Sequence, residues 1–104
     1  MKTGTRFEID EEKVLREKQY NLEAMYKIID EVAIKRAHLT KKAKNHFIFE
    51  GENAPAYVGI FVFNYMVEYE WFTKNLKSWE WLDEDEGNTN IITMLKGDNK
   101  GIWA

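Results

Sequence analysis

The stretch WEWLDEDEG, residues 79–87, holds the most unusual group of side chains in the chain. Two tryptophans flank Glu80, and four consecutive acids follow after a single leucine. Tryptophan is a good cation–π partner and a frequent interface anchor. If one indole lies at the surface, the stretch is suited to bind a basic peptide or a cationic side chain. If both are buried, the acids form only a solvated loop that ends a strand.

A calcium loop is the sharpest alternative for these acids, and the spacing argues against it. An EF-hand loop counted from Asp83 requires a ligand at its fifth position, glycine at its sixth and glutamate at its twelfth. The sequence places Gly87, Asn88 and Met94 there. Weak, nonspecific binding of divalent ions by neighbouring carboxylates stays open.

Catalytic and cofactor motifs are missing from the sequence. The chain has no cysteine, which excludes thiolate metal sites and cysteine nucleophiles. His38 and His46 lie eight residues apart without a defined nucleophile partner, since Ser78 is the only serine. No glycine-rich phosphate loop occurs. We therefore expect no catalytic residue, no cofactor and no metal site, and a protein that is not an enzyme.

A basic run offers an alternative function, the binding of nucleic acid. Residues 35–44 contain five cations and no acid, and cations of this kind contact phosphates. The run has no aromatic residue to stack on a base, and the favourable effect of cations at a helix end explains part of it. The cations are Lys35, Arg36, Lys41, Lys42 and Lys44.

Large aromatic rings are too many for one core of this size, since 14% of the residues are Phe, Trp or Tyr. Some rings should stay at the surface, where apolar patches mark partner or self-association sites. We expect a protein-interaction or regulatory module that holds a partner protein, with a homodimer also possible. The predicted partner-binding residues are Trp71, Trp79, Trp81, Asp83, Glu84, Asp85 and Glu86.

Length and charge place the chain in a broad class. The 104 residues are expected to form a single domain, residues 1–104, with an ordinary hydrophobic core. The net charge of −3 gives no general attraction to nucleic acid or to an anionic membrane. The longest nearly apolar run, residues 54–67, is too short to span a bilayer, and no signal peptide is evident. We expect a cytoplasmic protein.

The amino-terminal half alternates between strand and helix signals. Residues 5–9 alternate as a strand does, and Asp10 is a suitable N-cap for a helix that begins at Glu11. The helical pattern runs to Ala37, with a break favoured near Tyr20 and Asn21, where Asn21 would cap a second helix. Residues 41–45 are predicted to be a loop, and residues 46–50 a strand.

The carboxy-terminal half contains the most apolar segment. Residues 56–72 are predicted to form one central buried helix, preceded by Pro55 at a first helical position. Residues 77–83 alternate as a strand, with Trp79 and Trp81 on one face. Residues 83–90 are expected to be a loop, and residues 91–95 are either a short helix or a strand.

These elements predict an α+β fold. A short sheet of about three strands would pack against an N-terminal amphipathic helix or helix pair and against the central apolar helix. A further alternative function is a small-ligand pocket between the sheet and that helix. The pocket would be lined by Tyr57, Asn64 or Tyr65.

Overall fold

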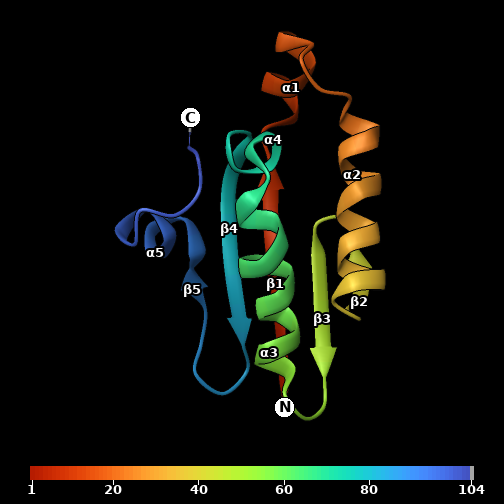
Figure 1. Cartoon of the computed structure of the whole chain (residues 1–104). Coiled ribbons are helices and arrows are strands. Elements are labelled where there is room, and N and C mark those ends of the chain that lie inside the picture. Colours follow the sequence, from red (N-terminus) through yellow and green to blue (C-terminus); the bar gives the residue numbers. More distant parts are fainter. Residues whose placement is uncertain (104) are drawn as a thin grey trace.

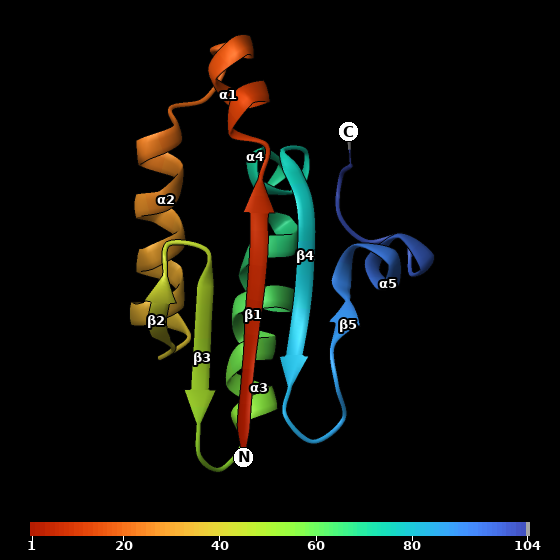
Figure 2. The same cartoon turned by 180° about the vertical axis from the view of Figure 1, so that it is seen from behind.

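The computed structural model, which describes residues 1–103, is an α+β fold with a five-stranded antiparallel sheet. The strand order is β2-β3-β1-β4-β5, so the first strand of the chain is the central one. Helices cover one face of the sheet (Figure 1), and the view from behind shows β1, β3 and β4 uncovered (Figure 2). The strands are β1 (Lys2–Ile9), β2 (Thr40–Ala43), β3 (His46–Glu50), β4 (Leu76–Asp83) and β5 (Thr89–Asn90).

The helices form two long segments and several short ones. The first long segment joins an α-helix to a π-helical turn, and the second adds a 3-10 turn at its end. Both long segments lie in front of the sheet in Figure 1. The segments are α1 (Glu11–Glu17), α2 (Leu22–Glu31) with η1 (Val32–Arg36), α3 (Ala54–Gly59) with η2 (Ile60–Tyr65) and η3 (Met66–Glu68), α4 (Glu70–Thr73), and α5 (Ile91–Gly97).

The two predicted caps are confirmed, and they place the break between α1 and α2. Asp10 accepts a hydrogen bond from the main-chain N–H of Lys13, at 3.1 Å, and Asn21 accepts one from that of Ala24, at 2.8 Å. Lys18 ends α1 in a left-handed conformation, with φ of 55°. Each cap satisfies a helix-end donor and stabilises its helix by about 1 kcal/mol.

The structure places helical turns over residues 54–68 and again over residues 70–73, so the prediction of one continuous helix over residues 56–72 is wrong. Tyr69 has an extended backbone, with φ of −91° and ψ of 105°, which separates η3 from α4. Phe72 then packs edge-on against Phe7 and Trp79, with ring centroids 5.2 and 5.0 Å apart. The break thus directs α4 back onto the sheet, where Phe72 is fully buried.

The sheet has two more strands than the sequence predicted. The expected loop at residues 41–45 is largely strand β2, which pairs with β3, and the expected loop at 83–90 ends in β5, which pairs with β4. Both are short edge strands of mostly polar residues. Edge strands often carry charged residues and lack an alternating apolar pattern, so the sequence contains no strand signal there. Residues 91–97 form the helix α5, and Asn90 caps it by accepting from the main-chain N–H of Thr93.

Trp79 lies in the core between the sheet and the helices, with 1% of its surface exposed. Its indole N–H donates to the hydroxyl of Thr5 at 2.9 Å, and that hydroxyl donates to the carbonyl of Glu80 at 2.9 Å. The hydrogen bond satisfies the polar atom of an otherwise apolar side chain, as burial requires. No helix within residues 1–103 is both long enough and apolar enough to cross a bilayer.

Trp79→Ala is expected to lower the free energy of unfolding by about 3–5 kcal/mol, because it opens a large cavity in the core. Trp81→Ala is the matched control, since that indole is only half-buried, and it should cost clearly less. Urea unfolding followed by circular dichroism measures both values. Equal losses for the two variants would contradict the burial described here.

Candidate functional site

Trp81 lines a groove between η2, β5 and α5. It stands two residues beyond Trp79 on β4 and therefore points to the same, helix-covered face. The groove has a volume of about 250 Å³. We call it the Trp81 groove. It is lined by Phe63 of η2, Trp81 of β4, Thr89 of β5 and Met94 of α5.

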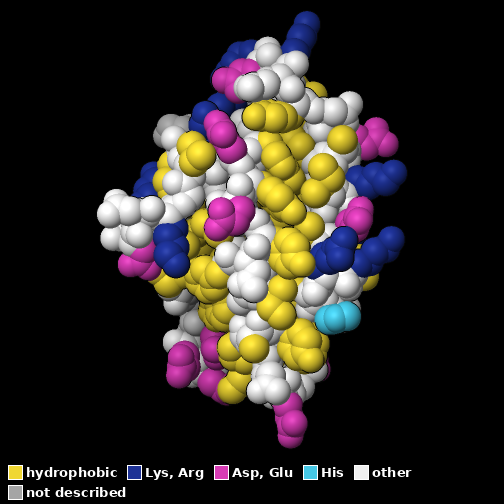
Figure 3. Space-filling model, viewed as in Figure 1, with side chains coloured by type: hydrophobic (Ala, Val, Ile, Leu, Met, Phe, Trp, Pro, Cys, Tyr) yellow, Lys and Arg dark blue, Asp and Glu magenta, His cyan; other side chains and the backbone are white. Residues whose placement is uncertain are grey.

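The two rings of the Trp81 groove are stacked and accessible. The ring centroids of Phe63 and Trp81 lie 6.1 Å apart with an interplanar angle of 29°. Phe63 has 37% of its surface exposed, while Trp81 and Met94 are half-buried. In Figure 3, apolar side chains gather between the central helix and α5, and acidic side chains lie below them, where β4 turns into β5. The groove is thus an apolar surface with an acidic border.

The acidic turn, residues 83–86, contains four carboxylates. Two of them accept hydrogen bonds within the protein, and the other two are exposed. Asp83 accepts from the main-chain N–H groups of Asp85 and Glu86, at 2.8 and 3.0 Å. Glu84 accepts from the main-chain N–H of Lys2 at 2.9 Å, which ties the turn to β1. Asp85 and Glu86 are exposed and form no ion pair within residues 1–103. These two carboxylates are available to an incoming cation.

The structure brings together only part of the predicted partner-binding set. Trp79 is buried, so the expectation that it contributes to a surface is corrected. Trp71 belongs to α4, where it stacks on Tyr69 with ring centroids 5.3 Å apart. Figure 1 shows α4 beside the start of β4 and the acidic turn at its other end. Trp81 and the acidic turn remain as neighbours. Sequence reasoning missed Met94, because its segment had no decided structure.

The five cations of the basic run do not form one surface. Lys41 pairs with Asp30 of α2 at 2.7 Å, on the helical side of β2. Lys42 lines a hollow on the opposite, uncovered face of the sheet. Lys44 pairs with Glu11 at 2.8 Å. Lys35 and Arg36 lie on η1, which packs against β2 on its helical side.

Lys44 belongs to a small polar cluster that holds α1, α2 and the β2–β3 turn together. Its ammonium group lies 4.9 Å from the centre of the Tyr26 ring. The Tyr26 hydroxyl donates to the same carboxylate oxygen of Glu11 at 2.5 Å. The hydrogen bond from Lys44, aided by the one from Tyr26, lowers the pKa of Glu11. Lys44 is thereby engaged within the protein.

The space between the sheet and the central helix is filled by side chains. Phe61 and Val62 have no exposed surface there. Tyr57 and Tyr65 are half-buried, and Asn64 is exposed to solvent. These positions give no support to a ligand pocket at the predicted place. Within residues 1–103, no three Asp, Glu or His side chains lie close enough together to hold a metal ion.

Comparison with known proteins assigns no family to the chain. It matches no protein-family model, no curated protein and no solved structure. The functional argument therefore depends on the geometry and the charges of the surface.

Lys44→Gln is expected to raise the pKa of Glu11 toward its usual value of 4.5, because the strongest hydrogen bond to the carboxylate is lost. A lowered pKa in the folded state stabilises the fold above pH 4.5, and this contribution disappears as pH falls through the folded-state pKa. The pair is solvent-exposed, so the loss at neutral pH should stay below about 1 kcal/mol.

Carboxyl NMR titration of Glu11 measures this shift, with Lys35→Gln as the control that leaves the pKa unchanged. An unaltered Glu11 pKa in Lys44→Gln would show that Lys44 is not engaged in the cluster.

Proposed function

We propose that the protein is a non-catalytic interaction module that holds a short segment of a partner protein in the Trp81 groove. The segment presents a large apolar side chain to the groove and a lysine or arginine to the acidic turn. One observation carries this proposal: an accessible indole, stacked on Phe63, lies in an apolar groove, and the turn after its strand carries two exposed carboxylates that form no ion pair within residues 1–103.

The dimensions of the groove favour a side chain over a free metabolite. Its volume of about 250 Å³ lies below the range of roughly 300–1,000 Å³ that is common for small-molecule pockets. A groove of this size accepts one or two apolar side chains of a peptide. Trp81 and Phe63 offer rigid contact area, and the flexible Met94 adapts to different shapes.

The charges around the groove favour a basic occupant. Asp85 and Glu86 follow Trp81 by four and five residues, and both are exposed. A cation of the partner gains from these carboxylates and from the face of the Trp81 ring. Lys96, a cation of α5, lies over the Trp103 ring at 5.7 Å. A partner with an acidic segment would be repelled by the turn.

Catalysis and nucleic-acid binding receive less support from the same surface. The described residues form no nucleophile and base pair near the groove, whose lining consists of Phe63, Trp81, Thr89 and Met94. The basic run is divided between two sides of the sheet, and two of its members pair with acids. An apolar groove with an accessible indole is therefore the best-supported feature.

A random dodecapeptide display library panned on the protein tests the proposal. Enriched peptides are expected to combine a large apolar residue with a nearby lysine or arginine. Trp81→Ala should weaken a selected peptide by at least about tenfold, because it removes the central anchor. Trp71→Ala, which removes a half-buried indole at the other end of β4, should leave the affinity almost unchanged. Fluorescence anisotropy measures each affinity, and thermal melts confirm folding.

The double variant Asp85→Asn and Glu86→Gln should weaken the same peptide mainly at low ionic strength, because these charges are exposed and screened by salt. Glu12→Gln with Glu17→Gln on α1 is the charge-matched control. Enriched peptides that lack cations, or that bind Trp81→Ala equally well, would contradict the proposal. A homodimer in sedimentation that Trp81→Ala dissociates would assign the groove to a second copy of the chain instead.

A further inference from the structure

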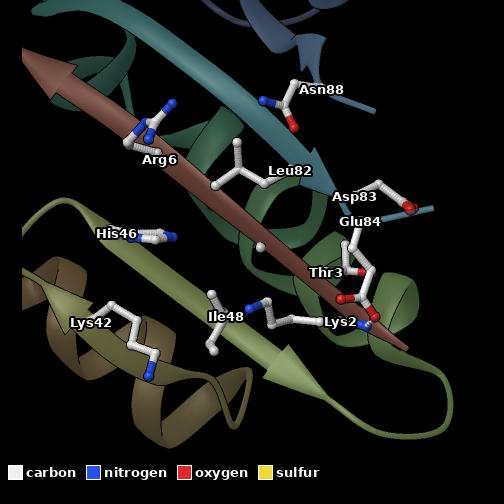
Figure 4. A pocket seen from close by; sticks show the side chains of 11 residues that line it. Lys2, Thr3, Arg6, Lys42, His46, Ile48, Leu82, Asp83, Glu84 and Asn88 are labelled. Carbon is white, nitrogen blue, oxygen red and sulfur yellow. Dashed lines mark hydrogen bonds between the residues drawn. The ribbon is translucent and has the colours of Figure 1, made fainter. Parts of the chain in front are cut away.

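The uncovered face of the sheet carries a charged hollow that is separate from the Trp81 groove. Figure 2 shows this face, and Figure 4 shows the hollow from close by, with side chains contributed by β1, β2, β3 and β4. Its volume is about 320 Å³. Four of its lining residues carry basic groups, namely Lys2, Arg6, Lys42 and His46. It is called here the open-face hollow.

Strand register assembles the hollow from distant parts of the chain. Arg6 of β1 is paired with His46 of β3, and Gly4 is paired with Ile48 on one side and Leu82 on the other. Paired residues of neighbouring strands point to the same face of a sheet, as do residues two apart along a strand. The cationic side chains therefore lie on the uncovered face together with the apolar side chains of Ile48 and Leu82.

No side chain projects from the sheet at Gly4, in the middle of the hollow. A Cβ atom at this position would lie 2.7 Å from the carbonyl oxygen of Phe47 and 2.9 Å from Cγ2 of Ile48. Such contacts are too close for any larger residue without a shift of the backbone. Ile48 and Leu82 stand on either side of the glycine. The floor is thus a flat apolar strip between two aliphatic side chains.

Two of the cations in the hollow have no direct partner of their own. Glu84 and Asp83, at one end, already accept hydrogen bonds from main-chain N–H groups. Arg6 is paired with Glu80 at 3.0 Å. The ammonium groups of Lys2 and Lys42 form no hydrogen bond or ion pair within residues 1–103. Two ammonium groups are therefore left without a direct partner on this face, while Asp83 and Glu84 keep their negative charges at its end.

His46 lies close to the cations of the hollow. Partial burial lowers the pKa of its imidazole, and the charges of Arg6, Lys42 and Lys2 lower it further. Each of these cations acts on His46 from β1 or β2. A bound anion would remove this repulsion and would itself gain from the same three cations.

We propose that the open-face hollow binds a small organic phosphate. The phosphate lies among Lys2, Arg6, Lys42 and His46, and the organic body lies on the strip formed by Gly4, Ile48 and Leu82. A phosphate carries up to two negative charges and several acceptor oxygens, which suits a site with separate lysine and arginine donors. The large rings of β1 and β4, such as Phe7 and Trp79, point to the covered face, so base stacking does not contribute here.

Titration of the protein with phenyl phosphate, at constant ionic strength, tests this inference. The imidazole NMR signals of His46 are expected to shift to saturation, and its pKa should rise when the ligand is bound. Lys42→Gln and Lys2→Gln should each weaken binding by about tenfold, because each removes one charge-assisted contact. Lys35→Gln on η1 is the control that removes an equal charge elsewhere, and it should leave binding unchanged.

Two further ligands separate the phosphate group from the organic body. Inorganic phosphate should bind more weakly than phenyl phosphate, and Leu82→Gln should reduce the affinity for phenyl phosphate while leaving that for inorganic phosphate unchanged. The proposal is overturned if His46 does not respond to phenyl phosphate, or if Lys35→Gln weakens binding as much as Lys42→Gln. An eight-residue thymidine oligonucleotide is the last ligand. If it shifts the same His46 signals, binds more tightly than phenyl phosphate and is weakened by salt, the hollow is a nucleic-acid site and the proposal is wrong.

Discussion

The alternation of side chains along β1 and β4, against a single layer of helices, determines the rest of the molecule. The pleat sends successive residues to opposite faces of the sheet, and only one face is covered. Phe7 and Trp79 therefore enter the core, while Arg6 and Glu80 meet on the open side. A shift of register by one residue would reverse every one of these positions and expose the core.

The two proposed sites follow from where the helical layer ends. Trp81 points to the covered face, but it lies at the margin between η2 and α5, so its ring is only half-buried. Leu82, the next residue, points to the open face and belongs to the other site. One strand thus supplies adjacent residues to an apolar groove and to a cationic hollow. Glu84, tied to Lys2, connects the turn of the first site to an edge of the second.

Sequence reasoning succeeded where local interactions decide the structure. Asp10 and Asn21 act as caps through contacts within three residues, and both were predictable. It failed where distant segments decide: β2 becomes a strand only because β3 lies beside it, and Tyr69 breaks the helix where Phe72 packs on the sheet. Trp79 and Trp81 differ in burial because of where the helices lie on the sheet, which the sequence did not show. The open-face hollow left no signal in the sequence, since register alone brings residues 2, 6, 42 and 46 together.

Hydroxyl-radical footprinting of the folded protein, read by tandem mass spectrometry, tests this one-sided arrangement most directly. Trp79 and Trp81 lie on the same proteolytic peptide, so each serves as an internal reference for the other. The structure predicts rapid oxidation of Trp81 and protection of Trp79 until the protein is unfolded. Oxidation of Trp79 as fast as that of Trp81 in the folded protein, or equal protection of both, would contradict the account.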